Sequence, residues 1–245
     1  MTEFILAAIA HQPSSVNTKK ALVSAECEAR FESKILPRLT NRSAVFVEGH
    51  YRPYLIEPEF KEYSLCLTQL GGRFAEILKG IRPALGCFDP RWSGDYQKSL
   101  KIWNLEQAWL SSCVKIVDFN SLYSLSSFEE LLERIRTGDF AIPMRRAPDP
   151  KEIEVARRVY GLNRRFNRSF IDAMRRYAPW YDTCVLVAGF SHCLSVALHT
   201  GWELVNLKGE NREALEDMFI GYVGGEIMPR LLAEENTLNL FKDSK

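Results

Sequence analysis

Residues 183–207 read TCVLVAGFSHCLSVALHTGWELVNL and contain the pattern of a strand, a turn, a helix and a second strand. The apolar run over residues 184–188 is short and rich in β-branched side chains, which is typical of a strand buried on both faces. An apolar-periodic segment follows, and Gly201 stands where a helix can end with positive φ. A second short strand is expected over residues 202–207. This order predicts an α/β fold.

Ionisable side chains follow the apolar runs of this chain. His192 comes three residues after Gly189, a residue that permits a tight turn at the end of the predicted strand. In an open α/β sheet the residues just past the carboxyl end of a strand line the ligand crevice. A histidine there is a candidate for chemistry, and the alternative that His192 only caps or packs the turn stays open.

Two earlier apolar runs are also followed by ionisable side chains. Residues 4–10 form an apolar run that leads into His11, and residues 44–47 lead into Glu48 and His50. The carboxyl ends of parallel strands meet at one edge of a sheet, so these side chains and His192 are expected to converge. A cluster of imidazoles and a carboxylate is suited to binding a metal ion or to moving protons.

Composition limits the classes of protein that fit. The chain has 245 residues, of which 46% are hydrophobic, and this predicts a single α/β domain over residues 1–245. A formal net charge of +1 gives no case for a nucleic-acid partner. The six cysteines show no C-x-x-C spacing, which favours free thiols in the cytoplasm. Glu3 replaces the positive start of a signal peptide, and no apolar run has the roughly 18 residues of a membrane span.

The amino-terminal part predicts a βαβ unit. A helix is expected from residue 19 to residue 36, where Pro37 would end it, and the strand over residues 44–47 follows. The crossover of such a unit is right-handed. No G-x-G-x-x-G follows the first strand, so a dinucleotide site is disfavoured.

The middle of the chain is predicted to be mostly helical. An aromatic, acidic loop is expected over residues 51–63, and a short strand over residues 84–88 leads to Asp89, which could reach the same edge or form an Asx-type turn. Further elements are expected as helices at 65–79, 96–113 and 128–136, a strand at 114–119 and a proline-rich connector at 140–150. We therefore expect a mainly parallel central sheet flanked by helices, with a helical middle insertion. The core would be residues 4–50 and 150–207, and residues 51–148 would cover the site.

A long amphipathic helix is predicted over residues 151–177. Six apolar or aromatic side chains fall on one face, and four arginines fall on the other. Asn163 lies near the centre of the apolar face and Asn167 lies toward its side. A buried asparagine needs a hydrogen-bond partner, so Asn163 could point to the site or cap a carbonyl. A helix is also expected over residues 211–222, and Gly224, Gly225 and Pro229 are expected to interrupt helical structure beyond residue 222.

Three features of this sequence stand together: residues 9–11 with serines at 14 and 15, residues 45–48, and residues 185–192 after an arginine-rich helix. This order resembles the TraB/TIKI group, a superfamily of G-x-x-H proteins that includes the erythromycin esterases and the ChaN-like haem-binding proteins. The resemblance implies an α/β fold, a divalent metal ion such as Mn, Co or Zn, and two motifs at residues 8–11 and 189–192. The first motif has Ala8 in place of glycine, and the family's helix arginine is expected within residues 163–166.

The leading hypothesis is a metal-dependent hydrolase of the TraB/TIKI and erythromycin-esterase type. His11, Glu48 and His192 would hold the metal ion, and its bound water would attack an ester, amide or phosphate-type bond. His50, or Glu48 if it is not a metal ligand, would be the general base. The residues expected to contact a small-molecule or peptide substrate are Arg52, Asp89, Asn163 and Arg164.

Several alternatives stay open. A non-catalytic module could bind a small ligand or haem in the same crevice, with histidine as an axial ligand. The histidines could also merely cap strands in an unrelated α/β protein. A nucleophilic Ser191 or Cys193 is less favoured, because adjacent positions on a turn rarely point the same way. A homo-oligomer is compatible with the sequence, and no membrane partner is expected.

Overall fold

A computed structural model describes residues 2–9, 25–48, 54–56, 81, 83–88, 96–119, 127–137, 142 and 144–234. The chain divides into two compact units. The first comprises Met1–Gly94 and Phe166–Gly209, and the second comprises Asp95–Arg165 and Glu210–Lys245. The core ranges predicted from the sequence fall in the first unit, except for residues 150–165. That the whole chain is one domain, with residues 51–148 covering the site, stays a prediction.

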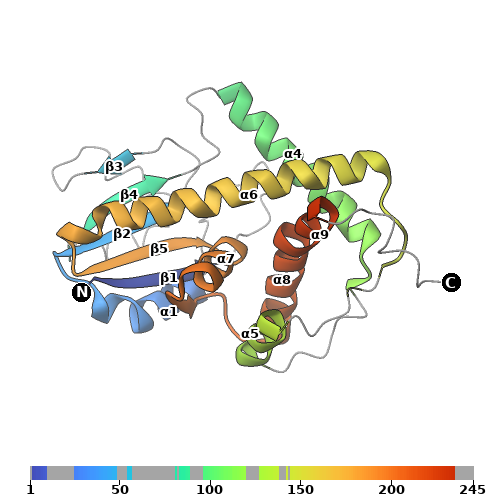
Figure 1. Cartoon of the computed structure of the whole chain (residues 1–245). Helices are drawn as coiled ribbons and strands as arrows, with labels where there is room; N and C mark the ends of the chain where they lie inside the picture. The colour runs from blue at the N-terminus through green and yellow to red at the C-terminus, as the bar shows by residue number, and fades with distance from the viewer. Residues whose placement is uncertain are drawn as a thin grey trace. The chain divides into compact units, whose positions relative to one another are not determined.

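The first unit is built on a six-stranded sheet with the order β3-β4-β2-β5-β1-β6 (Figure 1). The strands are β1 (Glu3–Ile9), β2 (Ser43–Glu48), β3 (Tyr54–Ile56), β4 (Ala84–Phe88), β5 (Thr183–Gly189) and β6 (Glu203–Asn206). Every pairing is parallel except that of β3 with β4, which is antiparallel. The predicted mainly parallel α/β sheet is confirmed.

The central strand β5 lies between β1 and β2 and is buried along its whole length. Its β-branched and apolar sequence suits a strand covered on both faces. One face of the sheet packs with helix α1 (Ala25–Lys34), since Val45 and Val47 share a buried cluster with Phe31. Side chains alternate along a strand, so Phe46 points to the other face, where its ring lies 6.0 Å from that of Tyr177. Helices therefore cover both faces of the sheet.

Helix α7 (Phe190–Thr200) connects β5 to β6 as predicted. It begins directly after Gly189, the last residue of β5. It ends at Gly201, which has a φ of 73° and donates its N–H to the carbonyl of Ala197. The strand-helix-strand order of the sequence is confirmed, but the predicted turn between β5 and α7 is wrong, because Phe190, Ser191 and His192 already lie in the helix.

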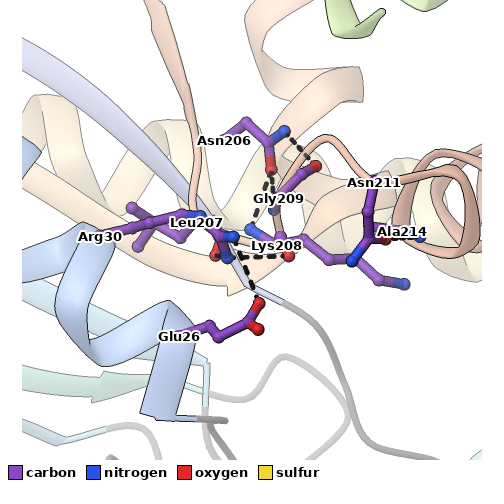
Figure 2. Close-up of polar contacts among 8 residues, drawn as sticks. All are labelled: Glu26, Arg30, Asn206, Leu207, Lys208, Gly209, Asn211 and Ala214. Carbon is purple, nitrogen blue, oxygen red and sulfur yellow. Dashed lines mark hydrogen bonds and ion pairs between the residues drawn. The ribbon is translucent and has the colours of Figure 1, made fainter. Parts of the chain in front are cut away.

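The turn that leaves β6 is held by side chains of the first unit (Figure 2). The Asn206 amide oxygen accepts the N–H groups of Lys208 and Gly209 at 2.9 and 3.1 Å. The Arg30 guanidinium of α1 donates to the carbonyls of Leu207 and Lys208 at 3.2 and 3.1 Å. Gly209 has a φ of 113°, and a Cβ there would lie 2.8 Å from Arg30 Nη2. The turn therefore requires glycine.

The second unit is helical. It contains α4 (Tyr96–Ile116), α5 (Phe128–Thr137), the first part of α6 (Pro150–Tyr177), α8 (Arg212–Tyr222), a π-helical turn (Val223–Ile227) and α9 (Met228–Glu234). Helices α4 and α5 follow β4 and precede α6 in the sequence, which confirms the predicted helical middle insertion.

Helix α6 has the two faces expected from its periodicity. The apolar face is buried, as shown by the small exposed fractions of Ala156, Val159, Phe166, Phe170 and Met174. The arginines predicted for the opposite face, at 157, 164, 168 and 175, are all exposed. Asp149 and Glu152 form a reciprocal capping box at its start, because Asp149 accepts the Glu152 N–H at 2.9 Å while Glu152 accepts the Asp149 N–H at 2.9 Å.

The predicted strand over residues 114–119 is wrong. Helix α4 continues to Ile116, and only Val117 forms an isolated bridge, with Met144. Trp109, Cys113 and Ile116 are fully or almost fully buried at helical spacing, whereas Val114 is 53% exposed. Tertiary burial at a period of 3.6 residues therefore overrides the local β-propensity.

Other boundaries also differ from prediction. Helix α1 ends at Lys34, and Pro37 lies inside a short 3-10 turn, Leu36–Arg38, rather than ending the helix directly. The predicted loop over residues 51–63 contains β3, which pairs at the sheet edge. The predicted helix over residues 65–79 lies outside the described residues.

The expected break at Gly224 and Gly225 is also wrong, because the backbone stays helical as a π-helical turn. Two side chains of the second unit compensate for the wider turn. Trp109 Nε1 donates to the carbonyl of Gly224 at 2.6 Å, and Asn163 Nδ2 donates to the carbonyl of Gly225 at 2.6 Å. Pro229 has no N–H to donate to the carbonyls four and five residues before it, and these are the carbonyls of Gly225 and Gly224 that Asn163 and Trp109 satisfy.

Candidate functional site

The carboxyl ends of β2, β5 and β1 lie side by side at one edge of the sheet. Val47 of β2 is paired with Val187 of β5, and Ile9 of β1 is paired with Gly189. The prediction that these strand ends converge is confirmed for the described residues. His11 follows Ile9 by two positions in the sequence and lies outside the described residues.

Glu48 is the last residue of β2, and its side chain is only 4% exposed. Its Oε2 atom accepts the backbone N–H of Gly189 at 2.8 Å. Gly189 is the N-cap residue of α7, so the carboxylate lies at the positive end of that helix. A hydrogen bond to an ionised carboxylate is stronger than one between neutral groups. The contact holds the carboxylate in a fixed orientation.

His192 lies in the first turn of α7, with its side chain 14% exposed. Its Nδ1 atom lies 2.8 Å from Oδ1 of Asn167. The rings of Phe166 and Phe170 meet the imidazole edge-on, with centroids 6.2 and 5.9 Å away. One turn of α6 thus supplies a polar contact and two aromatic contacts that orient this histidine.

Glu48 and His192 face each other through Oε1 and Nε2, which are 3.9 Å apart. This separation is too long for a hydrogen bond. A carboxylate oxygen and an imidazole nitrogen are both ligands for Zn, Mn and related ions. The Nδ1 contact to Asn167 also has the form seen in metal sites, where the second ring nitrogen of a ligating histidine is hydrogen-bonded.

Glu48 and His192 are two of the three predicted metal ligands, and the chemistry of their side chains suits that role. The third predicted ligand, His11, is not among the described residues. Within the described part of the chain, no group of three or more His, Cys, Asp and Glu side chains is placed to hold a metal ion. A complete ligand set therefore requires a residue from outside that part.

Cys193, the alternative nucleophile, is fully buried beside this site. Its thiol donates to the carbonyl of Ala188 at 3.5 Å. Burial, with a further contribution from the Glu48 carboxylate, raises the pKa of the thiol well above its ordinary value. Because the thiolate is the nucleophile, these surroundings disfavour a catalytic role for Cys193.

The predicted substrate contacts Asn163 and Arg164 lie in the second unit. Asn163 is buried and uses its amide to cap the carbonyl of Gly225, which is one of the two roles expected for it. Arg164 is exposed, and its guanidinium carbon lies 5.6 Å from the centroid of the Tyr160 ring. Their substrate-binding roles stay predictions. His50, Arg52 and Asp89 lie outside the described residues.

Asn167 is the site residue that the sequence analysis did not select. The only feature of the sequence that pointed to Asn167 was the position of a polar side chain at the border of the apolar face of α6. The family resemblance directed attention to an arginine within residues 163–166, and Asn167 lies one position beyond that window. Its contact with His192 depends on how α6 and α7 pack, which local periodicity does not give.

The fold and this pair define an α/β protein with a buried carboxylate and an imidazole at the carboxyl edge of a parallel sheet. Comparison with models of protein families, with curated proteins and with solved structures finds no match for the chain. A search of the described helices finds none with the length and apolarity needed to cross a membrane.

Proposed function

We propose that this protein is a metal-dependent hydrolase of the TraB/TIKI and erythromycin-esterase type, with His11, Glu48 and His192 as ligands of a divalent cation. The observation that supports it best is the pairing of the buried Glu48 with the partly buried His192, whose Oε1 and Nε2 atoms are 3.9 Å apart. The chemistry of the pair suits Mn, Co or Zn. A small molecule or peptide with an ester, amide or phosphate-type bond is the proposed substrate class.

The proposed roles combine a cation with side chains that the protein holds in place. A bound divalent cation would act as a Lewis acid that lowers the pKa of a water molecule toward neutrality. The N–H of Gly189 holds Glu48, and the contact with Asn167 holds His192, so both side chains are oriented before a ligand arrives. His50 would accept the proton from water, or Glu48 would do so if it is not a ligand of the cation.

Substrate binding is assigned on the sequence prediction. Arg52 would stabilise the negative charge that develops on the substrate oxygen. Asp89 is the further substrate contact in this proposal. The hydrolysed bond is left at the level of its class, because no described residue selects among an ester, an amide and a phosphate-type bond.

The proposal is tested by hydrolysis assays with chelator-treated protein. A panel of ester, amide and phosphate-ester substrates is assayed before and after addition of Mn²⁺, Co²⁺ or Zn²⁺. Metal-restored turnover should be lost in Glu48→Gln and His192→Ala. His199→Ala is the matched control, because His199 is an exposed histidine of the same helix α7.

Two results would count against the hydrolase. Turnover that persists after chelation, and in Glu48→Gln, would remove the metal mechanism. Ligand binding without turnover, such as a haem Soret band that His192→Ala abolishes, would favour the non-catalytic binding module.

A further inference from the structure

The contact between α6 and α7 determines which nitrogen of His192 carries its proton. A neutral imidazole has one N–H and one nitrogen with a lone pair. The amide oxygen of Asn167 accepts hydrogen bonds and cannot donate them, and it lies 2.8 Å from Nδ1. This geometry places the proton on Nδ1 and the lone pair of the neutral ring on Nε2.

We propose that Asn167 is a positioning residue that selects the Nδ1–H tautomer of His192 and so presents the Nε2 lone pair toward Glu48. The Nε2 atom is the nitrogen that lies 3.9 Å from Glu48 Oε1. A metal ligand or general base uses a lone pair, so the selected tautomer is the one this site needs. The use of this lone pair rests on the proposed metal-dependent function, whereas the choice of tautomer does not.

The surroundings of the ring reinforce this selection. Phe166 and Phe170 are 4% and 1% exposed and pack against the imidazole from the same turn of α6. Turning the ring over would remove Nδ1 from Asn167 and place a C–H group against the amide oxygen. The flipped ring would therefore lose the hydrogen bond to Asn167 while it stays packed between the two phenylalanines.

The opposite tautomer, with the proton on Nε2, would give this site a different chemistry. If the amide group of Asn167 donated to Nδ1, the proton would lie on Nε2 and would point toward the Glu48 carboxylate. Glu48 and His192 would then resemble an acid–base pair rather than two ligands of one cation. The tautomer therefore separates two chemistries for the same pair of side chains.

The tautomer is measured by long-range ¹H–¹⁵N correlation NMR on the ¹⁵N-labelled, chelator-treated full chain. The spectra are recorded at increasing pH until the His192 signals no longer change, so that its ring is neutral. The His192→Gln variant assigns the His192 signals among the chain's four histidines. Wild type is compared with Asn167→Leu and with Arg168→Ala, a neighbouring exposed position on α6 that is the matched control.

Wild type and Arg168→Ala should both show a protonated Nδ1 and an unprotonated Nε2. Asn167→Leu should show a mixed or reversed tautomer. An Nε2–H tautomer in the wild type would overturn the proposal, and so would an unchanged Nδ1–H tautomer in Asn167→Leu.

Asn167→Asp provides a second test that does not depend on the folding of the leucine variant. A carboxylate at this position should keep the Nδ1–H tautomer and raise the pKa of His192, because a neighbouring negative charge favours the imidazolium. A pH titration of the His192 signals measures this shift. A His192 pKa equal to that of the wild type would overturn the contact.

A Zn²⁺ titration separates failure of this inference from failure of the proposed function. Zinc should shift the Nε2 signal of the wild type while Nδ1 stays protonated, and Asn167→Leu should bind zinc about 10–100-fold more weakly. If the tautomer is as expected but zinc never shifts Nε2, the metal site is contradicted and the role of Asn167 stands. If zinc binds but the tautomer does not depend on Asn167, the role of Asn167 is contradicted and the metal site stands.

Discussion

Replacing Glu48 with alanine and with glutamine separates its structural contact from its charge. Glu48 Oε2 accepts the Gly189 N–H at 2.8 Å, and both groups are buried. Alanine removes the acceptor and leaves a buried N–H unsatisfied, at a cost of about 1–3 kcal/mol in the free energy of unfolding. Glutamine keeps an amide oxygen in nearly the same place and removes the charge that faces His192.

The alanine variant should therefore be about 1–3 kcal/mol less stable than the glutamine variant, while both variants lose divalent-metal affinity. Urea unfolding followed by tryptophan fluorescence measures the stability, and the midpoint and slope are both compared. Glu154→Gln serves as the control, because Glu154 is exposed on α6. Equal stability of the two Glu48 variants would refute the role of the Gly189 contact. Wild-type metal affinity in Glu48→Gln would refute the role of the charge.

Three further variants test the framework around the site. Arg38→Met should lower stability at pH 7 by at most about 1 kcal/mol. Arg38 lowers the pKa of the half-exposed Glu203, so its contribution is present above about pH 4.3 and is lost as the pH falls through the folded pKa. Urea unfolding at pH 7 and in acid should show the two proteins converging in acid. Gly209→Ala should cost about 1–3 kcal/mol by urea unfolding, because a residue with a Cβ is strained at a φ of 113° and the Arg30 guanidinium would have to move away from the turn. Trp109→Phe should cost about 1–3 kcal/mol in the same assay, because a buried glycine carbonyl loses its donor.

The sequence predicts the sheet well, because strand burial is a local signal. β5 is buried at every residue, and its apolar run is short and bounded by Gly189. The meeting of Glu48 with His192 was also predictable. Each follows or ends an apolar strand, and parallel strands have their carboxyl ends at one edge.

Features that depend on packing between elements were not predictable. Val114 looked like part of a strand, yet α4 continues past it because Cys113 and Ile116 are buried at helical spacing. The Gly224–Gly225 pair looked like a break, but Trp109 and Asn163 satisfy its carbonyls. Tertiary hydrogen bonds there outweigh the low helix propensity of glycine.

The same reason explains why Asn167 was missed. Periodicity placed it at the border of the buried face of α6, but its partner is set by the position of α7. Only the packed structure brings its oxygen to 2.8 Å from His192 Nδ1.

The most direct test of a metal site at the carboxyl edge of the sheet is metal stoichiometry. Elemental analysis and calorimetry with Mn²⁺, Co²⁺ and Zn²⁺ are carried out on wild type, His11→Ala, His192→Ala and the control His199→Ala. We predict stoichiometric metal in the wild type and in the control, and its loss in both His11→Ala and His192→Ala. No binding of any of the three ions by the wild type, or binding that survives both replacements, would contradict the metal site.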